Sequence, residues 1–182
     1  MTKFTQEQIK MLVKKGESST LEFKKSTAQL QAAFQTVCAF LNNDGGVILI
    51  GVTDNGRIIG QEVADRTKRE LAEEQIRIEP PIQLSIEYVS VEENKQVIVI
   101  NVLSGIHVPY TYDGRPYQRD QSVTRKMSQQ LYDQLILKRN QLNYAWEKFI
   151  AHDYRLEWLD ENMILRVVRN AIEFQRLPEI AA

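Results

Sequence analysis

Cysteine and histidine are scarce in this chain of 182 residues, which contains one cysteine, Cys38, and two histidines, His107 and His152. A single cysteine cannot form an internal disulfide, and two isolated histidines do not supply the ligands of a Cys/His zinc site. Cys38 lies on the apolar stripe of an expected helix, so we interpret it as a packed hydrophobic side chain rather than a nucleophile. Disulfide-stabilised folds are therefore excluded, and zinc-finger folds are not expected.

Long apolar runs and a strong net charge are also missing. No stretch of about 18 apolar residues could span a bilayer, and the N-terminus lacks the apolar core of a secretory signal, so we expect a cytoplasmic protein without a membrane partner. The 23 Lys and Arg residues are balanced by 24 Asp and Glu residues, which gives a formal net charge of −1. Any nucleic-acid-binding surface must therefore be a local concentration of Lys and Arg.

The most strongly apolar segment covers residues 45–52. It is an uninterrupted run of aliphatic and β-branched residues between glycines, which is typical of a strand buried on both faces. The Asp54-Asn55-Gly56 sequence that follows predicts a tight hairpin turn. We therefore expect this strand to lie at the centre of the fold.

Periodicity along the rest of the chain predicts the other elements. The expected helices cover residues 6–15, 30–43, 65–78, 129–138 and a C-terminal stretch of about 142–177. The expected strands cover residues 20–24, 57–60, 82–91, 96–103 and the arms of a hairpin around Asp113-Gly114. This order predicts an α+β fold, a mixed sheet with flanking helices, followed by a helical C-terminal extension.

Three details of this prediction concern single residues. Alternation over residues 20–24 places Glu22 on the face opposite Leu21 and Phe23, so we expect it to point away from the core. Residues 26–29 have the form of a capping box that would begin the next helix. We also expect Ile76, near the end of the helix over residues 65–78, to face the core.

Three carboxylates are candidate metal ligands and catalytic groups: Glu17, Glu22 and Asp54. If they met, they would repel one another unless a divalent cation such as Mg²⁺ or Mn²⁺ neutralised them, and that cation could orient a water for strand scission. The alternative is a loop residue, a solvated strand residue and an ordinary turn residue. Positions 17 and 22 differ by an odd number, so they can converge only if Glu17 lies in the turn before the strand.

Basic and aromatic residues are interleaved around the second hairpin and beside Glu22. They could contact phosphates and stack on bases, and the alternative is a solvated surface with core-packing tyrosines. The candidate nucleic-acid contacts are Lys24, Lys25, Arg115, Tyr117, Arg119, Arg125 and Lys126, with Tyr110 and Tyr112 available for stacking. Arg119 is the strongest single basic candidate.

Four ordered motifs resemble those of the Schlafen-type AlbA_2 domain. They are Glu17-Ser18 with Leu21-Glu22-Phe23-Lys24; Ala39-Phe40-Leu41-Asn42 with Gly45-Gly46; Leu49-Ile50-Gly51-Val52-Thr53-Asp54 with Ile59-Gly60; and Pro109-Tyr110 with Tyr117-Gln118-Arg119. The resemblance covers roughly residues 16–139. Bacterial members are usually regarded as DNA-binding domains at the N-terminus of larger transcriptional regulators or helicase-like ATPase proteins. It implies a nucleic-acid-binding domain over residues 1–140 and a helical extension over residues 141–182 that leads toward C-terminal domains absent here.

The resemblance also extends to animal Schlafen relatives, in which three acids form a metal-dependent tRNA-cleaving site. Motif by motif, those acids correspond to Glu17, Glu22 and Asp54. Thr53 stands where relatives often have an acid, although that acid is not the one aligned with the catalytic position. The sequence contains no P-loop pattern, so we expect no ATPase activity from it.

Three functions follow, in order of preference. The first is a DNA- or RNA-binding module of a larger regulator or ATPase-type protein. The second is a metal-dependent endoribonuclease that uses Glu17, Glu22 and Asp54. The third is a protein-interaction module that forms a homo-oligomer. An acidic triad in a sequence does not by itself show catalysis, which sets this order.

Overall fold

The computed structural model describes residues 4–143 and 160–174. The chain divides into two units, Met1–Asn143 and Tyr144–Ala182. In the second unit one helix is described, α5 (Glu161–Glu173), and the Asp160 carboxylate caps it by accepting hydrogen bonds from the backbone N–H groups of Asn162 and Met163. The rest of the predicted C-terminal helix beyond residue 143 lies outside the described residues.

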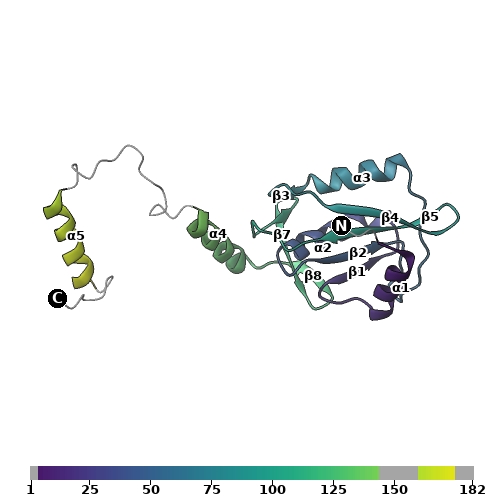
Figure 1. Ribbon diagram of the computed structural model, residues 1–182, viewed down its shortest axis with the longest axis horizontal. Helices are drawn as coiled ribbons and strands as arrows, with labels where there is room; N and C mark the ends of the chain where they lie inside the picture. The colour runs from purple at the N-terminus through teal and green to yellow at the C-terminus, as the bar shows by residue number, and fades with distance from the viewer. Residues whose placement is uncertain (1–3, 144–159, 175–182) are drawn as a thin grey trace. The chain divides into compact units, whose positions relative to one another are not determined.

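The first unit contains a mixed four-stranded sheet, as the sequence predicts (Figure 1). Its strand order is β1-β2-β5-β4; β1 runs parallel to β2, and the other neighbours are antiparallel. The central β2 has three fully buried residues, which agrees with the predicted burial on both faces. The strands are β1 (Leu21–Lys24), β2 (Gly46–Ile50), β4 (Ser85–Glu92) and β5 (Lys95–Val102).

A second, antiparallel sheet follows in the order β3-β6-β7-β8. The predicted turn at Asp113-Gly114 joins β6 to β7, and both residues have positive φ, 55° and 69°, as such a tight turn requires. Neither β3 nor β8 was predicted, and the helix expected over residues 65–78 ends at Gln75, before β3 begins. The strands are β3 (Ile78–Glu79), β6 (Thr111–Tyr112), β7 (Arg115–Asp120) and β8 (Val123–Lys126).

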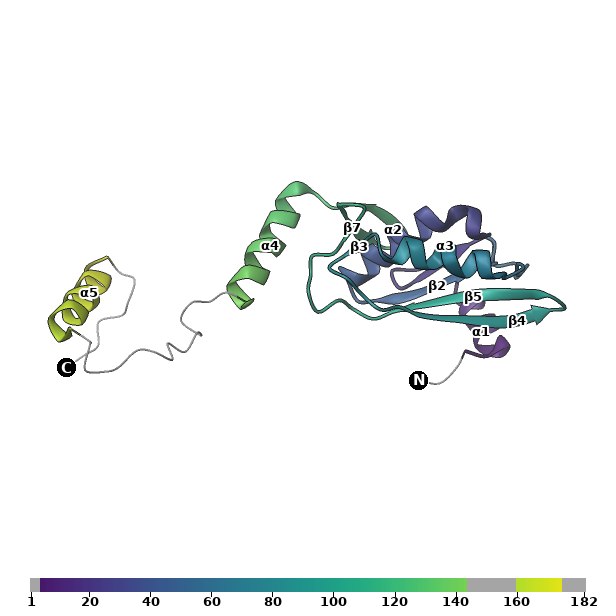
Figure 2. The same ribbon diagram turned by 90° about the horizontal axis from the view of Figure 1, so that it is seen from above.

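Helices cover both faces of the first sheet. Figure 2 shows α2 and α3 on one side of it and α1 on the other. The cluster under α1 contains Ile9, Phe23 and Leu49, whereas α2 packs against residues of both sheets. The α2 helix therefore joins the two sheets into one core. The helices are α1 (Gln6–Lys15), the 3₁₀ turn η1 (Thr27–Gln29), α2 (Leu30–Leu41), α3 (Asp65–Gln75) and α4 (Gln129–Asn143).

Some local predictions were confirmed and others were wrong. Thr5 caps α1 and Gly16 ends it, as predicted. The capping box at residues 26–29 was wrong, because Ser26 makes no capping bond and the Gln29 amide oxygen accepts from the backbone N–H of Lys25 instead. Ile76 is 79% exposed because α3 ends before it, so its predicted core contact was also wrong. Across the described ranges, no helix is long and apolar enough to cross a bilayer.

Cys38 is fully buried on α2, where its Sγ donates a hydrogen bond to the carbonyl of Tyr110 at 3.3 Å. Burial raises the pKa of the thiol to about 12.

We therefore predict that Ellman's reagent labels the native protein at least roughly 100-fold more slowly than the guanidinium-unfolded chain at about pH 8. In the folded protein the reagent cannot reach Sγ of Cys38, and the thiol stays protonated. Fast, stoichiometric labelling of the folded protein would contradict this packing.

Candidate functional site

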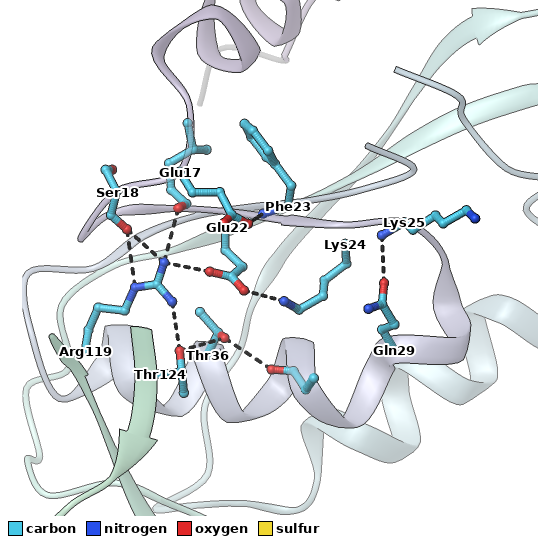
Figure 3. Close-up of polar contacts among 12 residues, drawn as sticks. Glu17, Ser18, Glu22, Phe23, Lys24, Lys25, Gln29, Thr36, Arg119 and Thr124 are labelled. Carbon is cyan, nitrogen blue, oxygen red and sulfur yellow. Dashed lines mark hydrogen bonds and ion pairs between the residues drawn. The ribbon is translucent and has the colours of Figure 1, made fainter. Parts of the chain in front are cut away.

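Glu22 on β1 is buried, with a side chain that is 9% exposed. Its Oε2 lies 2.6 Å from Nη2 of Arg119, and its Oε1 pairs with Nζ of Lys24 (Figure 3). The expectation that Glu22 points away from the core needs correction. It does face away from Leu21 and Phe23, which pack under α1, but the opposite face of β1 is covered as well. Glu22 is thus a buried charge with two cationic partners rather than a solvated residue.

Arg119 on β7 supplies the main partner, and its side chain is only 1% exposed. The guanidinium donates to the carbonyl of Ser18 from Nη2 at 2.8 Å, to the carbonyl of Leu21 at 3.3 Å and to Oγ1 of Thr124 at 2.9 Å. It also lies over the ring of Phe40, 5.3 Å from its centroid. A buried guanidinium with these partners cannot reach a phosphate in solution, so the direct nucleic-acid contact predicted for Arg119 does not agree with the structure.

Glu17, Ser18 and Arg119 complete the outer edge of β1. The carbonyls of Thr20 and Lys24 accept hydrogen bonds from the β2 segment, so the backbone groups of Leu21 and Phe23 face outward. The N–H of Phe23 donates to Oε1 of Glu17 at 2.9 Å, while the carbonyl of Leu21 accepts from the N–H of Ser18 and from Arg119. Side chains and a local turn thus satisfy an edge that would otherwise be open.

Asn42 connects α2 to the second sheet. Its Oδ1 accepts from the N–H of Tyr110 at 2.7 Å, and its Nδ2 donates to the carbonyls of Tyr110 and Tyr117 at 2.9 and 2.8 Å. Gly46 allows the chain to pass close by, because a Cβ there would lie 2.6 Å from the carbonyl oxygen of Thr20 and 2.7 Å from the ring of Phe40. Backbone hydrogen bonds therefore explain why the motif has Asn at position 42, and close packing explains why it has Gly at position 46.

The three candidate carboxylates lie in three different settings. Glu17 bonds the edge of β1 and Glu22 is paired with Arg119 and Lys24, whereas Asp54 is an exposed residue of the turn after β2. Within residues 4–143 and 160–174, no three His, Cys, Asp or Glu side chains are placed to hold a metal ion together. This donor set does not fit a shared Mg²⁺ or Mn²⁺ ion, and the catalytic role assigned to the triad remains a prediction.

The predicted nucleic-acid contacts divide into buried and exposed residues. Lys24 is 14% exposed and paired with Glu22, and Tyr117 is 6% exposed. Tyr110 and Tyr112 are also buried in the core, which is the alternative that the sequence left open for the tyrosines. The residues that remain exposed are Lys25, Arg115, Arg125 and Lys126.

A second polar network, which the sequence did not reveal, links α3 to the β6–β7 turn. Arg77 forms ion pairs with Asp113 at 2.7 Å and Glu74 at 3.0 Å, and its guanidinium lies 4.9 Å from the ring centroid of Tyr112. The Tyr112 hydroxyl donates to Glu74. Burial, followed by this bond, raises the pKa of Tyr112, while the hydrogen bond from Arg77 lowers the pKa of Asp113. Residues 36 positions apart carry no local pattern that signals their contact.

Residues 17–128 match the family described as Schlafen, AlbA_2. The solution structure of the N-terminal domain of a RecG-related, helicase-like protein from Nitrosomonas europaea is 19% identical, covers 85% of this chain and 99% of that domain, and has a TM-score of 0.51. The DIP2311 protein from Corynebacterium diphtheriae is 17% identical over 68% of this chain, with a TM-score of 0.47, and the matched part is 24% of that protein. No curated protein matches the sequence. The Nitrosomonas likeness shows a shared fold.

Removing the charge of Glu22 should destabilise the protein strongly. In Glu22→Gln, Arg119 keeps its charge in the interior without a counter-charge, so we predict that the free energy of unfolding falls by about 3–5 kcal/mol. Guanidinium denaturation followed by circular dichroism measures this change.

Asp120→Asn is the matched control, since it removes one carboxylate from an exposed ion pair with Arg125 whose side chains are 50% and 57% exposed. Its cost should stay below about 1 kcal/mol. Equal effects of the two substitutions would show that the buried pair has no special role.

Proposed function

Because this chain belongs to the Schlafen AlbA_2 family, we propose that its first unit binds nucleic acid through the exposed cations of the β7–β8 hairpin, Arg115, Arg125 and Lys126. The observation that carries this proposal is the exposure of these three side chains on one hairpin, while the motif residues Tyr117 and Arg119 of the same strands are buried. The buried residues hold the hairpin, and the exposed ones are accessible to phosphates, although Arg125 also forms an exposed ion pair with Asp120.

The acids of the same segment leave two of the three cations, Arg115 and Lys126, without an acidic partner. Asp113 is engaged by Arg77 of the chain segment after α3, at 2.7 Å, and Asp120 by Arg125, at 2.5 Å. In the parts of the chain that the structure describes, no acidic oxygen lies within 4 Å of a charged nitrogen of Arg115 or Lys126. Positive charge is therefore available locally although the net charge of the chain is −1.

The Nitrosomonas neighbour supports the same role. It is the N-terminal domain of a protein described as RecG-related and helicase-like. A domain with this fold that precedes a helicase domain would contribute contacts to the nucleic acid, while the helicase domain would hydrolyse ATP. We propose that the present unit serves a larger regulator or ATPase-type protein in this way. A metal-dependent nuclease is not proposed, because no contact in the site favours it.

The salt dependence of binding tests the size of the surface. With three hairpin cations, and Lys25 as a fourth exposed candidate, we predict a slope of log K against log salt of roughly −2 to −3.5, since each neutralised phosphate contributes about −0.7 on single strands and −0.9 on duplexes. Fluorescence anisotropy with single- and double-stranded DNA and RNA at several salt concentrations measures this slope. Absence of salt-dependent binding to all four would refute the proposal.

The identity of the surface is tested by substitution. The combined change Arg115→Ala and Lys126→Ala should weaken binding at low salt about tenfold and make the salt slope shallower by about 1–2, because two phosphate contacts are lost. Lys10→Ala together with Lys14→Ala is the matched control, since it removes the same charge from exposed positions of α1. An equal loss of affinity in both double variants would show that only the overall charge matters.

A further inference from the structure

The two sheets of the first unit have four outer strands, and three of them are protected against further pairing. The edge of β1 is filled by Glu17, Ser18 and Arg119. β3 is two residues long and is followed by Pro80 and Pro81, and β8 has four residues, two of them basic. Short length, proline and exposed Lys or Arg are the usual means by which edge strands avoid association.

β4 is the remaining outer strand and shows none of this protection along its first seven residues. It has eight residues, and positions 85–91 contain no Lys, Arg or Pro. Ile86 and Tyr88 are half-buried against the cluster that includes α2, and Val89 and Val91 are half-buried against the cluster under α1. Figures 1 and 2 show the strand at the border of the first sheet. It therefore presents apolar side chains on both faces of an open edge.

The register identifies which backbone groups of β4 point outward. On β5, the N–H and carbonyl of Gln96 bond to Gln61 on the side of β2, both at 2.9 Å. Since these directions alternate along a strand, Val97, Val99 and Asn101 bond to β4. Their partners on β4 are Val89, Glu87 and Ser85, which therefore bond inward to β5. The alternate residues Ile86, Tyr88 and Ser90 direct their N–H and carbonyl groups outward. Within the described residues, no hydrogen bond from another element reaches these groups.

We propose that β4 pairs with β4 of a second copy of this chain, antiparallel, about a twofold axis at Tyr88. In this register Tyr88 faces Tyr88 of the second copy, and Ile86 faces Ser90 on either side. Each of these three pairs exchanges two backbone hydrogen bonds, so every outward group of Ile86, Tyr88 and Ser90 is satisfied. Two four-stranded sheets become one continuous sheet, and the contact is the same patch on both copies.

Charge selects this register over its neighbours. An axis at Glu87 would place two Glu87 carboxylates directly opposite each other, which is unfavourable in a strand pair. An axis at Val89 would require pairing beyond Ser90, where the bulge between Ser90 and Glu92 breaks the regular spacing. With the axis at Tyr88, Glu87 instead faces Val89 of the second copy, and the bulge lies outside the paired segment.

The size of this contact predicts a reversible dimer. Pairing of two short strands buries less than the roughly 1,600 Å² of a standard stable interface. We therefore expect the full chain, 21.1 kDa as a monomer, to shift from monomer toward dimer as its concentration rises from about 1 to 100 μM in sedimentation velocity experiments. A wild-type chain that stays monomeric throughout this range would overturn the proposal.

Two substitutions at one position test the register. Val89→Glu places a carboxylate opposite Glu87 of the second copy at both ends of the pair, so the dimer should weaken at least tenfold. Val89→Lys places a cation there, so association should equal or exceed that of the wild type. Both changes introduce a charge at the same half-buried site, and circular dichroism checks that both variants fold. Equal effects of Glu and Lys on association would contradict the register.

Ser90 provides a second test in case the variants at position 89 are unfolded. Its side chain is exposed and its N–H points outward, away from β5. Ser90→Pro removes that donor without breaking the ladder to β5, and it should weaken the dimer at least tenfold, whereas Ser90→Ala should leave association within about twofold of wild type. A dimer that persists unchanged in Ser90→Pro would show that another surface forms it.

Discussion

The pair between Arg119 and Glu22 connects parts of the first unit that are far apart in the sequence. It lies between β1 of the first sheet and β7 of the second, and the guanidinium also reaches the carbonyls of Ser18 and Leu21. Burial of two charges costs free energy unless each is paired and hydrogen-bonded, and here the backbone, Thr124 and Lys24 supply the remaining partners. The positions of β1, of the turn before it and of the hairpin are thus mutually dependent.

This dependence gives the family motifs a common physical basis. Glu17 and Ser18 satisfy the outer edge of β1, and Gly46 allows β2 to pass Thr20 and Phe40. Asn42 binds the backbone of Tyr110, just before β6, and of Tyr117 on β7. Glu17 and Asn42 make these contacts with their side chains, and Gly46 allows its contact by having none, whereas Ser18 uses its backbone N–H and carbonyl. The function that we propose depends on residues outside this framework, namely the exposed cations of the β7–β8 hairpin. Of the motif acids, Glu17 and Glu22 belong to this framework, whereas Asp54 is exposed and separate from it. They do not assemble a metal site in the part of the chain that the structure describes.

Local signals in the sequence predicted much of the fold. The Thr5 cap, the Gly16 stop, the buried β2 and the Asp113-Gly114 turn all depend on neighbouring residues, and the structure contains each of them. The family motifs predicted the fold class, which the structure and the Nitrosomonas domain confirm.

The remaining features depend on contacts that no local pattern encodes. Alternation placed Glu22 on the correct face, but it did not reveal that this face is covered, and Arg119 resembles a surface cation until its partners 98 and 101 positions away are known. The same holds for Tyr117, whose side chain is buried in the core cluster that also contains residues of α2. Sequence reasoning left both a surface role and a core role open for the tyrosines, and the choice depends on partners that are distant in the sequence.

The central claim is that Arg119 is structural whereas Arg115 and Arg125 meet the nucleic acid. The most direct measurement is a nuclear magnetic resonance titration that observes the Nε–H groups of the arginine side chains while a short nucleic acid is added, with Arg119 assigned from an Arg119→Lys variant. We predict that the Arg119 signal is protected from solvent exchange before any addition, since its Nε donates to Ser18, and that it stays in place while those of Arg115 and Arg125 shift. An Arg119 signal that exchanges rapidly and shifts together with the other two would contradict the account.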